Sequence, residues 1–334
     1  MRSVSGALST VVAAPAFSIV SLISVLSVVA VISVGCGKVN ELKAKKAFKA
    51  ANQAYQAQDY KRAAQLYAET VENDPNLSSA YFFLGNSYDN QFKPSKRGEA
   101  DNDVLLEKAA QNYQTAAEKL TTSSDARDKQ LARRSLEFLV AIYGQDKLND
   151  PAKAEPIVQR MIQLDPSDTG SYFALAKIYE DAGAYDAAEQ TLLKAKEAKP
   201  NDPAVYMTLA GYYNRQGQFD KTIDALQQRA AKEPNNPEAF HTIATYYWDE
   251  AYRDFRLKEA QKKEFIQRGI EAVDRAIQIK PDYMEALVYK GLLLRLQANV
   301  EKDPKKQQEL LKEAGRLHDK AEELRKKRAA GVGE

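Results

Sequence analysis

The sequence predicts an all-α protein in which about seven helix–turn–helix units follow an apolar N-terminal segment. Three observations lead to this prediction. After residue 38 the composition is dominated by alanine, leucine, lysine, glutamate and glutamine, which are strong helix formers. Apolar residues recur with a fixed period of 34 residues, and such a period is typical of repeat proteins. Glycine and proline number only 15 and 12, so few positions break the helices.

The N-terminal segment comes first in the chain. Residues 3–37 carry no charge, Arg2 precedes them, and Cys36 is the only cysteine. A positive start, an apolar middle and a small-residue end are the layout of an export signal. Residues 33–37 resemble the lipobox of bacterial lipoproteins, although that family prefers leucine where this chain has Ser33. The resemblance implies that residues 1–36 are a signal peptide and that Cys36 carries a diacylglyceryl group and a fatty acid such as palmitate.

A retained membrane helix is the alternative interpretation of the same segment. Residues 16–37 form a run of 22 uncharged residues, which is long enough to cross a bilayer. Five lysines follow between residues 38 and 49, so a retained helix would keep the rest of the chain in the cytoplasm. We favour a periplasm-facing lipoprotein of a bacterial cell envelope and keep a cytoplasm-facing single-pass anchor second. In both cases the partners include a membrane.

The repeat is strictest between residues 166 and 247. In one unit, apolar residues at helical spacing form a first helix, Gly183 supplies a turn, and a second helix with Ala188 and Leu192 ends at Pro200. Small residues such as Ala176 and Ala188 allow two helices to approach closely. The aligned columns are Pro166, Pro200 and Pro234; Tyr172, Tyr206 and Phe240; Leu175, Leu209 and Ile243; Ala176, Ala210 and Ala244; and Tyr179, Tyr213 and Tyr247.

These columns resemble the tetratricopeptide repeat, a helix–turn–helix unit of about 34 residues. The resemblance implies a right-handed α-solenoid. We expect residues 37–120 to hold two units with an inserted loop at 89–108, and residues 121–128 to be a linker that hinges them against the rest. Residues 129–334 then hold units three to seven, and the sixth and seventh are extended.

Nothing in the sequence indicates catalysis. The two histidines, His241 and His318, lie 77 residues apart, and the chain has neither a phosphate-binding glycine loop nor an HExxH motif. The net charge of +2 is too small to gather nucleic acid. We therefore expect no enzyme activity, cofactor, metal, nucleic acid or small-molecule substrate.

Stacked repeats leave a concave groove lined by their first helices, and such grooves bind partners. The resemblance implies that the groove positions lie one residue after the first aromatic column, then four and eight residues further on. This mixture of apolar and polar residues suits an extended peptide or a helix of a protein partner. The candidate groove residues are Phe173, Lys177, Asp181, Met207, Gly211, Arg215, His241, Thr245 and Asp249.

Some members of the family hold a terminal carboxylate with lysines and asparagines of their first units. Asn52 and Asn86 stand at two of these positions, but Phe48 and Phe83 occupy positions where a lysine and a second asparagine belong. We therefore expect no carboxylate clamp in this chain.

Three aromatic residues, Trp248, Tyr252 and Phe255, are spaced i, i+4, i+7 in the extended sixth unit. Such spacing places them in one stripe of a helix. The stripe either packs against the extended seventh unit, around residues 292–300, or remains exposed as an anchor for a partner, since aromatic residues dominate interface hot spots.

The sequence as a whole predicts a membrane-tethered scaffold that binds a protein or peptide partner without catalysis. By resemblance, such lipoproteins act in outer-membrane assembly, in pilus or secretin biogenesis, or as adaptors of envelope proteases. A further alternative is a structural solenoid that associates with itself through the basic C-terminal end, residues 324–334.

Overall fold

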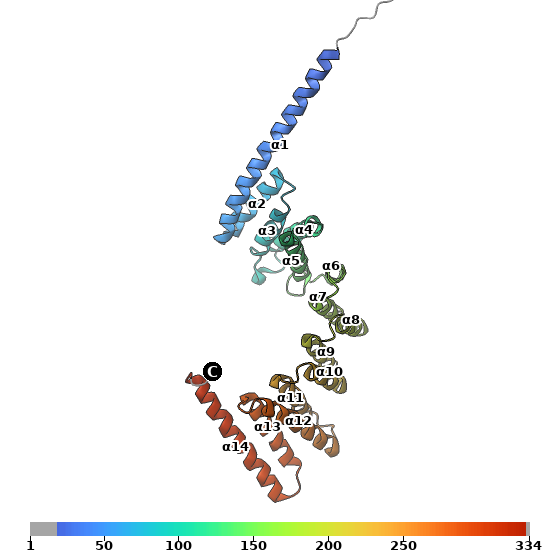
Figure 1. The fold of residues 1–334 in the computed structure, drawn as a ribbon, viewed down its shortest axis with the longest axis vertical. Helices are drawn as coiled ribbons and strands as arrows, with labels where there is room; N and C mark the ends of the chain where they lie inside the picture. Colours follow the sequence, from blue (N-terminus) through green and yellow to red (C-terminus); the bar gives the residue numbers. More distant parts are fainter. Residues whose placement is uncertain (1–18, 332–334) are drawn as a thin grey trace, which may run out of the picture. The chain divides into compact units, whose positions relative to one another are not determined.

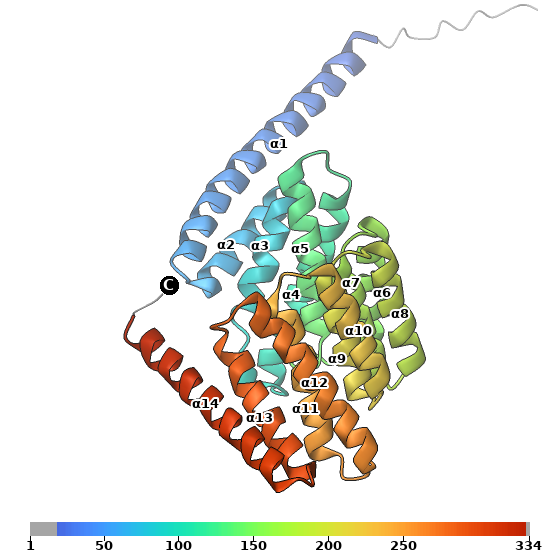
Figure 2. The same ribbon diagram turned by 60° about the horizontal axis from the view of Figure 1, so that its bottom comes forward.

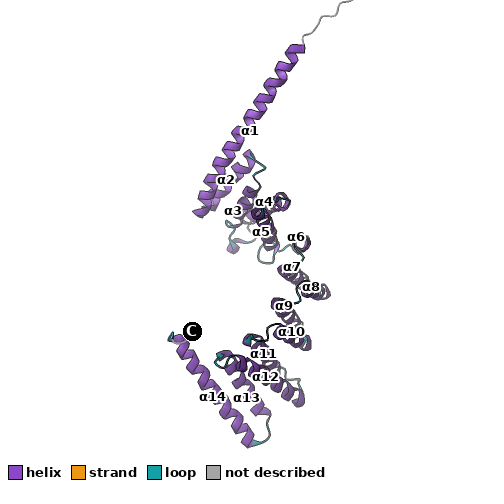
Figure 3. Ribbon diagram, in the orientation of Figure 1, coloured by secondary structure: helices purple, strands orange, loops and turns teal. Residues whose placement is uncertain are grey.

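The computed structural model describes residues 19–331, with side chains from residue 38 onward. The described range holds fourteen α-helices and one 3₁₀ turn, joined by loops (Figure 3). The predicted all-α fold is therefore confirmed. Cys36 and the signal or anchor predicted at 1–36 lie outside the residues whose side chains are described. Between residues 38 and 331, no helix is both long and apolar enough to cross a membrane.

The helices follow one another along the chain with short connections (Figure 1). They are α1 (Ile19–Gln56), α2 (Tyr60–Asn73), α3 (Ser78–Asp89), η1 (Pro94–Lys96), α4 (Ala100–Thr121), α5 (Ala126–Tyr143), α6 (Pro151–Leu164), α7 (Thr169–Asp181), α8 (Tyr185–Ala198), α9 (Pro203–Arg215), α10 (Phe219–Lys232), α11 (Pro237–Arg253), α12 (Glu259–Ile279), α13 (Met284–Val300) and α14 (Pro304–Ala329).

The chain divides into two compact units, Met1–Ile157 and Val158–Glu334, and the boundary falls inside α6. In the first unit, α1 packs on α2 and α3 packs on α4. In the second unit the pairs are α7 with α8, α9 with α10, α11 with α12, and α13 with α14 (Figure 2). Each helix pair is one helix–turn–helix unit of the repeat.

Small residues lie where the two helices of a pair approach each other. Ala176 of α7 and Ala188 of α8 are buried, at 3% and 0% exposure. In the first unit, a Cβ atom added to Gly85 would lie 3.1 Å from the carbonyl oxygen of Ala109. The small columns of the repeat therefore set the distance between helices, which depends on the side chains at the contact.

A hydrogen bond links each regular pair to the end of the preceding helix. The Tyr172 hydroxyl donates to the Pro166 carbonyl oxygen at 3.1 Å, and Tyr206 donates to the Pro200 carbonyl oxygen at 2.6 Å. Both carbonyl groups lie just beyond the C-terminus of a second helix. The tyrosine hydroxyls of this column therefore supply a donor to a main-chain carbonyl group in the connecting turn.

The turn between the paired helices uses left-handed backbone geometry. Gly183 and Gly217 have φ angles of +74° and +67°, which glycine adopts without steric cost. Gln58 takes the same place before α2 with φ +60°, although it carries a Cβ atom. Asn149, two residues before α6, also has a positive φ angle, of +51°, but asparagine tolerates this conformation better than glutamine does. The turn at Gln58 is therefore strained where the glycine turns are not.

The insertion predicted as a loop over 89–108 is shorter in the structure, because α4 already begins at Ala100. Asp101 and Asp103 lie in its first turn, where acidic side chains stabilise a helix. The Asn102 amide also holds the preceding loop in place. Its oxygen accepts from the Lys93 backbone N–H at 2.9 Å, and its nitrogen donates to the Lys96 carbonyl oxygen at 3.1 Å.

The predicted linker at 121–128 also differs from the structure. Only residues 122–125 connect α4 to α5. Asp125 caps α5 by accepting from the backbone N–H groups of Arg127 and Asp128 at 2.7 and 3.2 Å. Tyr113 of α4 stacks on Phe138 of α5 with ring centroids 5.0 Å apart. These helices are packed on each other, so the segment is a capped turn and not a hinge.

The helices of the last two pairs are longer than those of the regular pairs. The first helices α7 and α9 have 13 residues each, whereas α11 and α13 have 17. The second helices α8 and α10 have 14 residues each, whereas α12 has 21 and α14 has 26. The extra length lies inside the second compact unit.

Candidate functional site

The nine candidate groove residues lie three each on α7, α9 and α11, the first helices of consecutive pairs. None of the nine side chains is buried. We call these residues together the groove face. The fold therefore leaves these positions of three helices at least partly exposed, although Phe173 and Met207 also pack against the core.

Charged residues of the groove face are mostly paired with one another or with close neighbours. Lys177 forms an ion pair with Asp181 one turn further along α7. Arg215 of α9 donates from two guanidinium nitrogens to the Glu180 carboxylate of α7, at 2.7 and 2.9 Å. Asp249 accepts from Arg253 at 2.7 Å. The face therefore presents little unpaired charge, and Glu180 belongs to it although the sequence reasoning missed it.

Gly211 lies in the middle of the groove face, on α9. Only Nη1 of Arg215, at 3.4 Å, would be near a Cβ atom added at this position. The absent side chain therefore leaves open space between the flanking side chains of α7 and α11. No glycine conformation is required here, since Gly211 has ordinary helical geometry.

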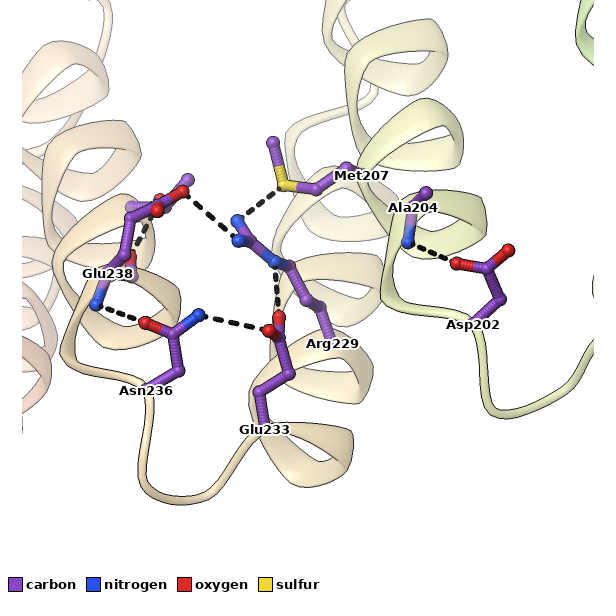
Figure 4. Close-up of polar contacts among 8 residues, drawn as sticks. Asp202, Ala204, Met207, Arg229, Glu233, Asn236 and Glu238 are labelled. Atoms are coloured by element: carbon purple, nitrogen blue, oxygen red, sulfur yellow. Dashed lines mark hydrogen bonds and ion pairs between the residues drawn. The ribbon is translucent and has the colours of Figure 1, made fainter. Parts of the chain in front are cut away.

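A buried arginine contacts the groove-face residue Met207 (Figure 4). Arg229 of α10 is 7% exposed and stands where the preceding repeat has Ala195. Its guanidinium donates from Nε to Glu233 at 2.8 Å, from Nη2 to Glu238 at 3.1 Å, and from Nη1 to the Met207 sulfur at 2.9 Å. The arginine therefore joins α9, α10 and α11 through a single side chain.

The three hydrogen bonds of Arg229 differ in strength. A buried charge is destabilising unless it is paired, and the two carboxylates of Glu233 and Glu238 supply that pairing. The Met207 thioether is a weak acceptor by comparison. Asn236 extends the arrangement, because its side chain donates to Glu233 at 3.0 Å and accepts from the Glu238 backbone N–H at 3.0 Å (Figure 4). Arg229 thereby fixes the position of Met207 on the groove face.

His241 packs against aromatic rings and belongs to no cluster of potential metal-ligating residues in the described part of the chain. Its ring meets those of Tyr283 and Tyr289 edge to face, with centroids 5.5 and 5.0 Å apart. Its Nε2 atom is buried and has no hydrogen-bond partner within residues 38–331. Burial lowers the pKa of His241, against the opposing influence of Glu285 and Glu238, so the imidazole is neutral near pH 7. No cluster of three or more potential metal ligands occurs in the described part of the chain.

The aromatic stripe divides into a packed end and an exposed end. Trp248 stacks on Tyr252 at 5.1 Å between centroids and meets Tyr289 of α13 edge to face at 5.7 Å. Tyr252 is 61% exposed and Phe255 is 93% exposed. Packing against the seventh unit therefore accounts for Trp248, whereas Phe255 remains free in the turn before α12.

The asparagines at the clamp positions are used inside the fold. Asn52 accepts from the Tyr67 hydroxyl at 2.6 Å. Asn86 accepts from the Tyr55 hydroxyl at 2.6 Å and donates to the Tyr113 hydroxyl at 3.0 Å. Burial raises the pKa of Tyr113, so its hydroxyl stays protonated and the network stays neutral. These amides hold the helices of the first unit together and are not presented to a ligand.

Two pockets between helices of the second unit were not foreseen from the sequence. One, of about 450 Å³, is lined by Phe240, Ile243 and Tyr247 between α10 and α12. The other, of about 400 Å³, is lined by Tyr172, Leu175 and Tyr179 between α6 and α8. The two sets of residues are 68 positions apart, which is two repeats.

The repeat between these pockets has a different lining. There, Lys221 pairs with Glu189 at 2.9 Å and lies over the Tyr213 ring at 5.0 Å. Long charged side chains therefore cover the aromatic column in that repeat. The repeat period alone predicts that the two pockets occupy equivalent positions. It does not show that charged side chains cover the same position in the repeat between them.

Residues 48–101 and 147–212 each match the tetratricopeptide repeat family. The chain matches no curated protein sequence. Similar solved structures include MamA, with 20% identity over 59% of this chain and 94% of that chain and a TM-score of 0.40. A tetratricopeptide repeat protein from Parabacteroides merdae has 14% identity over 82% and 99% and a TM-score of 0.43.

YrrB, described as a TPR protein with an unusual peptide-binding site, has 17% identity over 72% of this chain and 88% of its own, with a TM-score of 0.33. The family matches themselves fall on the helix pairs of both compact units. The chain described here therefore carries tetratricopeptide repeats in each of its two compact units.

Proposed function

We propose that the chain is a non-catalytic scaffold whose groove face binds an extended peptide or a helix of a protein partner. One observation carries this proposal: nine residues on three consecutive first helices reach the surface, around an open space at Gly211. Grooves of stacked repeats are the surface through which such proteins bind. The half-buried Phe173 and Met207 supply apolar contacts beside polar ones.

The pairing of charges on the groove face indicates how a partner is recognised. Because Lys177, Arg215 and Asp249 already have partners within the chain, a ligand gains little from their charge. Recognition then rests on shape, on apolar contact and on hydrogen bonds to the peptide main chain. We therefore expect binding that changes little between low and moderate salt.

We propose further that Cys36 is lipidated and holds the repeats at a bacterial cell envelope, facing the periplasm. The uncharged run 3–37 and the Gly-Cys pair at its end support this part of the proposal. Assembly of outer-membrane proteins, pili or secretion machinery is the class of role that fits a tethered scaffold. A cytoplasm-facing scaffold on a retained helix is the second candidate, because five lysines follow the run.

Site-specific crosslinking tests the groove face directly. A photoreactive amino acid would replace Met207 in the full chain, expressed in its native membranes, and a matched variant would carry it at Leu311 of α14, which is 48% exposed. We expect a discrete adduct from position 207 and none from position 311. Equal adducts from both positions, or none from position 207, would contradict the assignment.

A further inference from the structure

The turn between α11 and α12 carries an exposed aromatic residue. Phe255, in the turn between α11 and α12, is the most exposed large hydrophobic residue among those described, at 93%, and Tyr252 beside it is 61% exposed. Phenylalanine is among the residue types most often buried, so the two neighbouring exposed rings stand out on this turn. We call segments 252–263 and 302–306 together the basic tip.

The basic tip holds eight basic and three acidic residues, a net charge of +5 within these bounds. Four acidic residues, Asp249, Glu250, Glu264 and Glu301, flank it. Its two segments lie next to each other, since Lys302 approaches Glu259 at 3.9 Å. The basic residues are Arg253, Arg256, Lys258, Lys262, Lys263, Lys302, Lys305 and Lys306.

The same end of the second unit projects beyond its regular turns. α11 has four residues more than α7 and α9, and each helical residue adds 1.5 Å, so the tip lies roughly 6 Å further out. Arg253 and Arg256 keep side-chain exposures of 73% and 79%, although Arg253 pairs with Asp249 of the groove face and Arg256 pairs with Asp254 of the tip. The exposed Phe255 ring therefore lies on a turn that projects beyond the regular turns of the second unit, among basic side chains.

We propose that the basic tip docks on an anionic lipid bilayer, with Phe255 and Tyr252 inserted at headgroup level. Aromatic side chains prefer this level of a membrane, and juxtamembrane basic residues are attracted to anionic lipids. Each signal alone is weak, but two together give stable attachment. An anionic lipid surface complements both the excess of basic residues and the exposed ring.

The docking adds to the scaffold function and does not rest on lipidation of Cys36. Any attachment of the N-terminal segment to a membrane raises the local concentration of lipid around the tip and strengthens a weak contact. Docking would restrict how the second compact unit, and with it the groove face, is presented. Its failure would leave the groove proposal intact, because the crosslink at position 207 does not involve the tip.

The unique tryptophan allows a local test in the full chain. Trp248 is the only tryptophan, so the double variant W248F/F255W moves the reporter to the tip. The matched control W248F/Y185W places it at Tyr185, the first residue of α8, which is 49% exposed. Both proteins would be reconstituted into vesicles of phosphatidylcholine with phosphatidylglycerol, and into vesicles of phosphatidylcholine alone. Brominated lipids then quench any tryptophan that reaches the membrane.

We expect a blue shift and strong quenching for F255W on anionic vesicles, and neither for the control. Adding K258Q, K262Q, K302Q and K305Q to the reporter variant should weaken the tip contact at least about tenfold. Salt near 1 M, where the screening length is about 3 Å, should also weaken it. An unchanged F255W emission on anionic vesicles would overturn the proposal. A blue shift without vesicles that grows with protein concentration would overturn it too, in favour of contact between copies.

Discussion

The Tyr206 hydroxyl donates a hydrogen bond of 2.6 Å to the carbonyl oxygen of Pro200, and Tyr172 repeats it with Pro166 at 3.1 Å. Each bond joins the first helix of one repeat to the end of the helix before it. Phe240, the next member of the column, has no hydroxyl and leaves the Pro234 carbonyl without this donor. This hydrogen bond is therefore present in two of three successive repeats. Substitution at these positions can measure its contribution to the free energy of unfolding.

Removing this hydroxyl should destabilise the second unit. Tyr206→Phe should lower the free energy of unfolding by about 1 kcal/mol, because a net hydrogen bond is worth that much and the ring remains in place. The reciprocal variant, Phe240→Tyr, should raise it by a similar or smaller amount. Urea denaturation followed by circular dichroism gives both values. Equal stability of Tyr206→Phe and the parent protein would show that the bond contributes nothing.

The strained turn at Gln58 should be improved by glycine. Gln58→Gly should raise the free energy of unfolding by about 1 kcal/mol, because φ +60° costs a side-chain residue about that much and costs glycine nothing. The same substitution at Gln53, an exposed position inside α1, should lower it by about 1 kcal/mol. If the two substitutions change the free energy of unfolding in opposite directions, the backbone geometry at Gln58 is the cause. A loss of stability at both sites would refute the strain at Gln58.

The buried Arg229 should be sensitive to both charge and shape. Arg229→Ala should cost about 2–3 kcal/mol of stability, since it leaves Glu233 and Glu238 without their partner. Arg229→Lys keeps the charge but not the planar fork, so it should restore only part of the loss. Glu238→Gln should cost less than about 1 kcal/mol, because the Glu238 side chain is 61% exposed. A neutral Arg229→Ala variant would mean that the network is not stabilising.

The buried His241 should make stability depend on pH. Its folded pKa lies below the ordinary value of 6.5, so under acid conditions the unfolded chain takes up a proton that the folded chain does not. Stability is therefore full above about pH 6.5 and falls as the pH is lowered, by up to about 1.4 kcal/mol per pH unit. The loss stops once the folded imidazole also takes up its proton.

Thermal unfolding of the protein and of His241→Phe between pH 7 and pH 5 checks this dependence. Phenylalanine fits among Tyr283 and Tyr289 and cannot titrate, so the difference between the two curves reports His241 alone. Parallel curves over the whole range would contradict the expected linkage.

Much of the architecture follows from the sequence because the repeat is local. The columns through Tyr172, Ala176 and Ala188 have helical spacing, and a packed pair of helices is the only arrangement that buries them together. The start of α4 at Ala100 was missed because Pro94 and Gly98 mark a loop, whereas Asn102 anchors it through contacts that sequence spacing does not reveal.

The candidate site was foreseen only in part, for a physical reason. Periodicity tells which helix face a residue occupies, so the groove positions could be named. It does not tell what lies across a helix–helix contact. Arg229 was visible as a departure from the small-residue column, but its partners Met207 and Glu238 come from two other helices. Likewise, only the position of Tyr289 decides that Trp248 is packed while Phe255 is exposed.

Binding by the groove face is the central claim, and Gly211→Leu tests it most directly. A Cβ atom at this position meets only Nη1 of Arg215, at 3.4 Å, and leucine favours the helix over glycine, so stability should rise by roughly 0.5–1 kcal/mol. Gly315→Leu on α14 makes the same change where no neighbour lies within 4 Å, outside the groove face.

The measurement is the yield of the adduct from the crosslinker at position 207, in the parent protein and in both leucine variants. The account predicts that Gly211→Leu abolishes the adduct while raising the melting temperature, and that Gly315→Leu raises the melting temperature and keeps the adduct. An adduct of full yield in Gly211→Leu would contradict binding at the groove face.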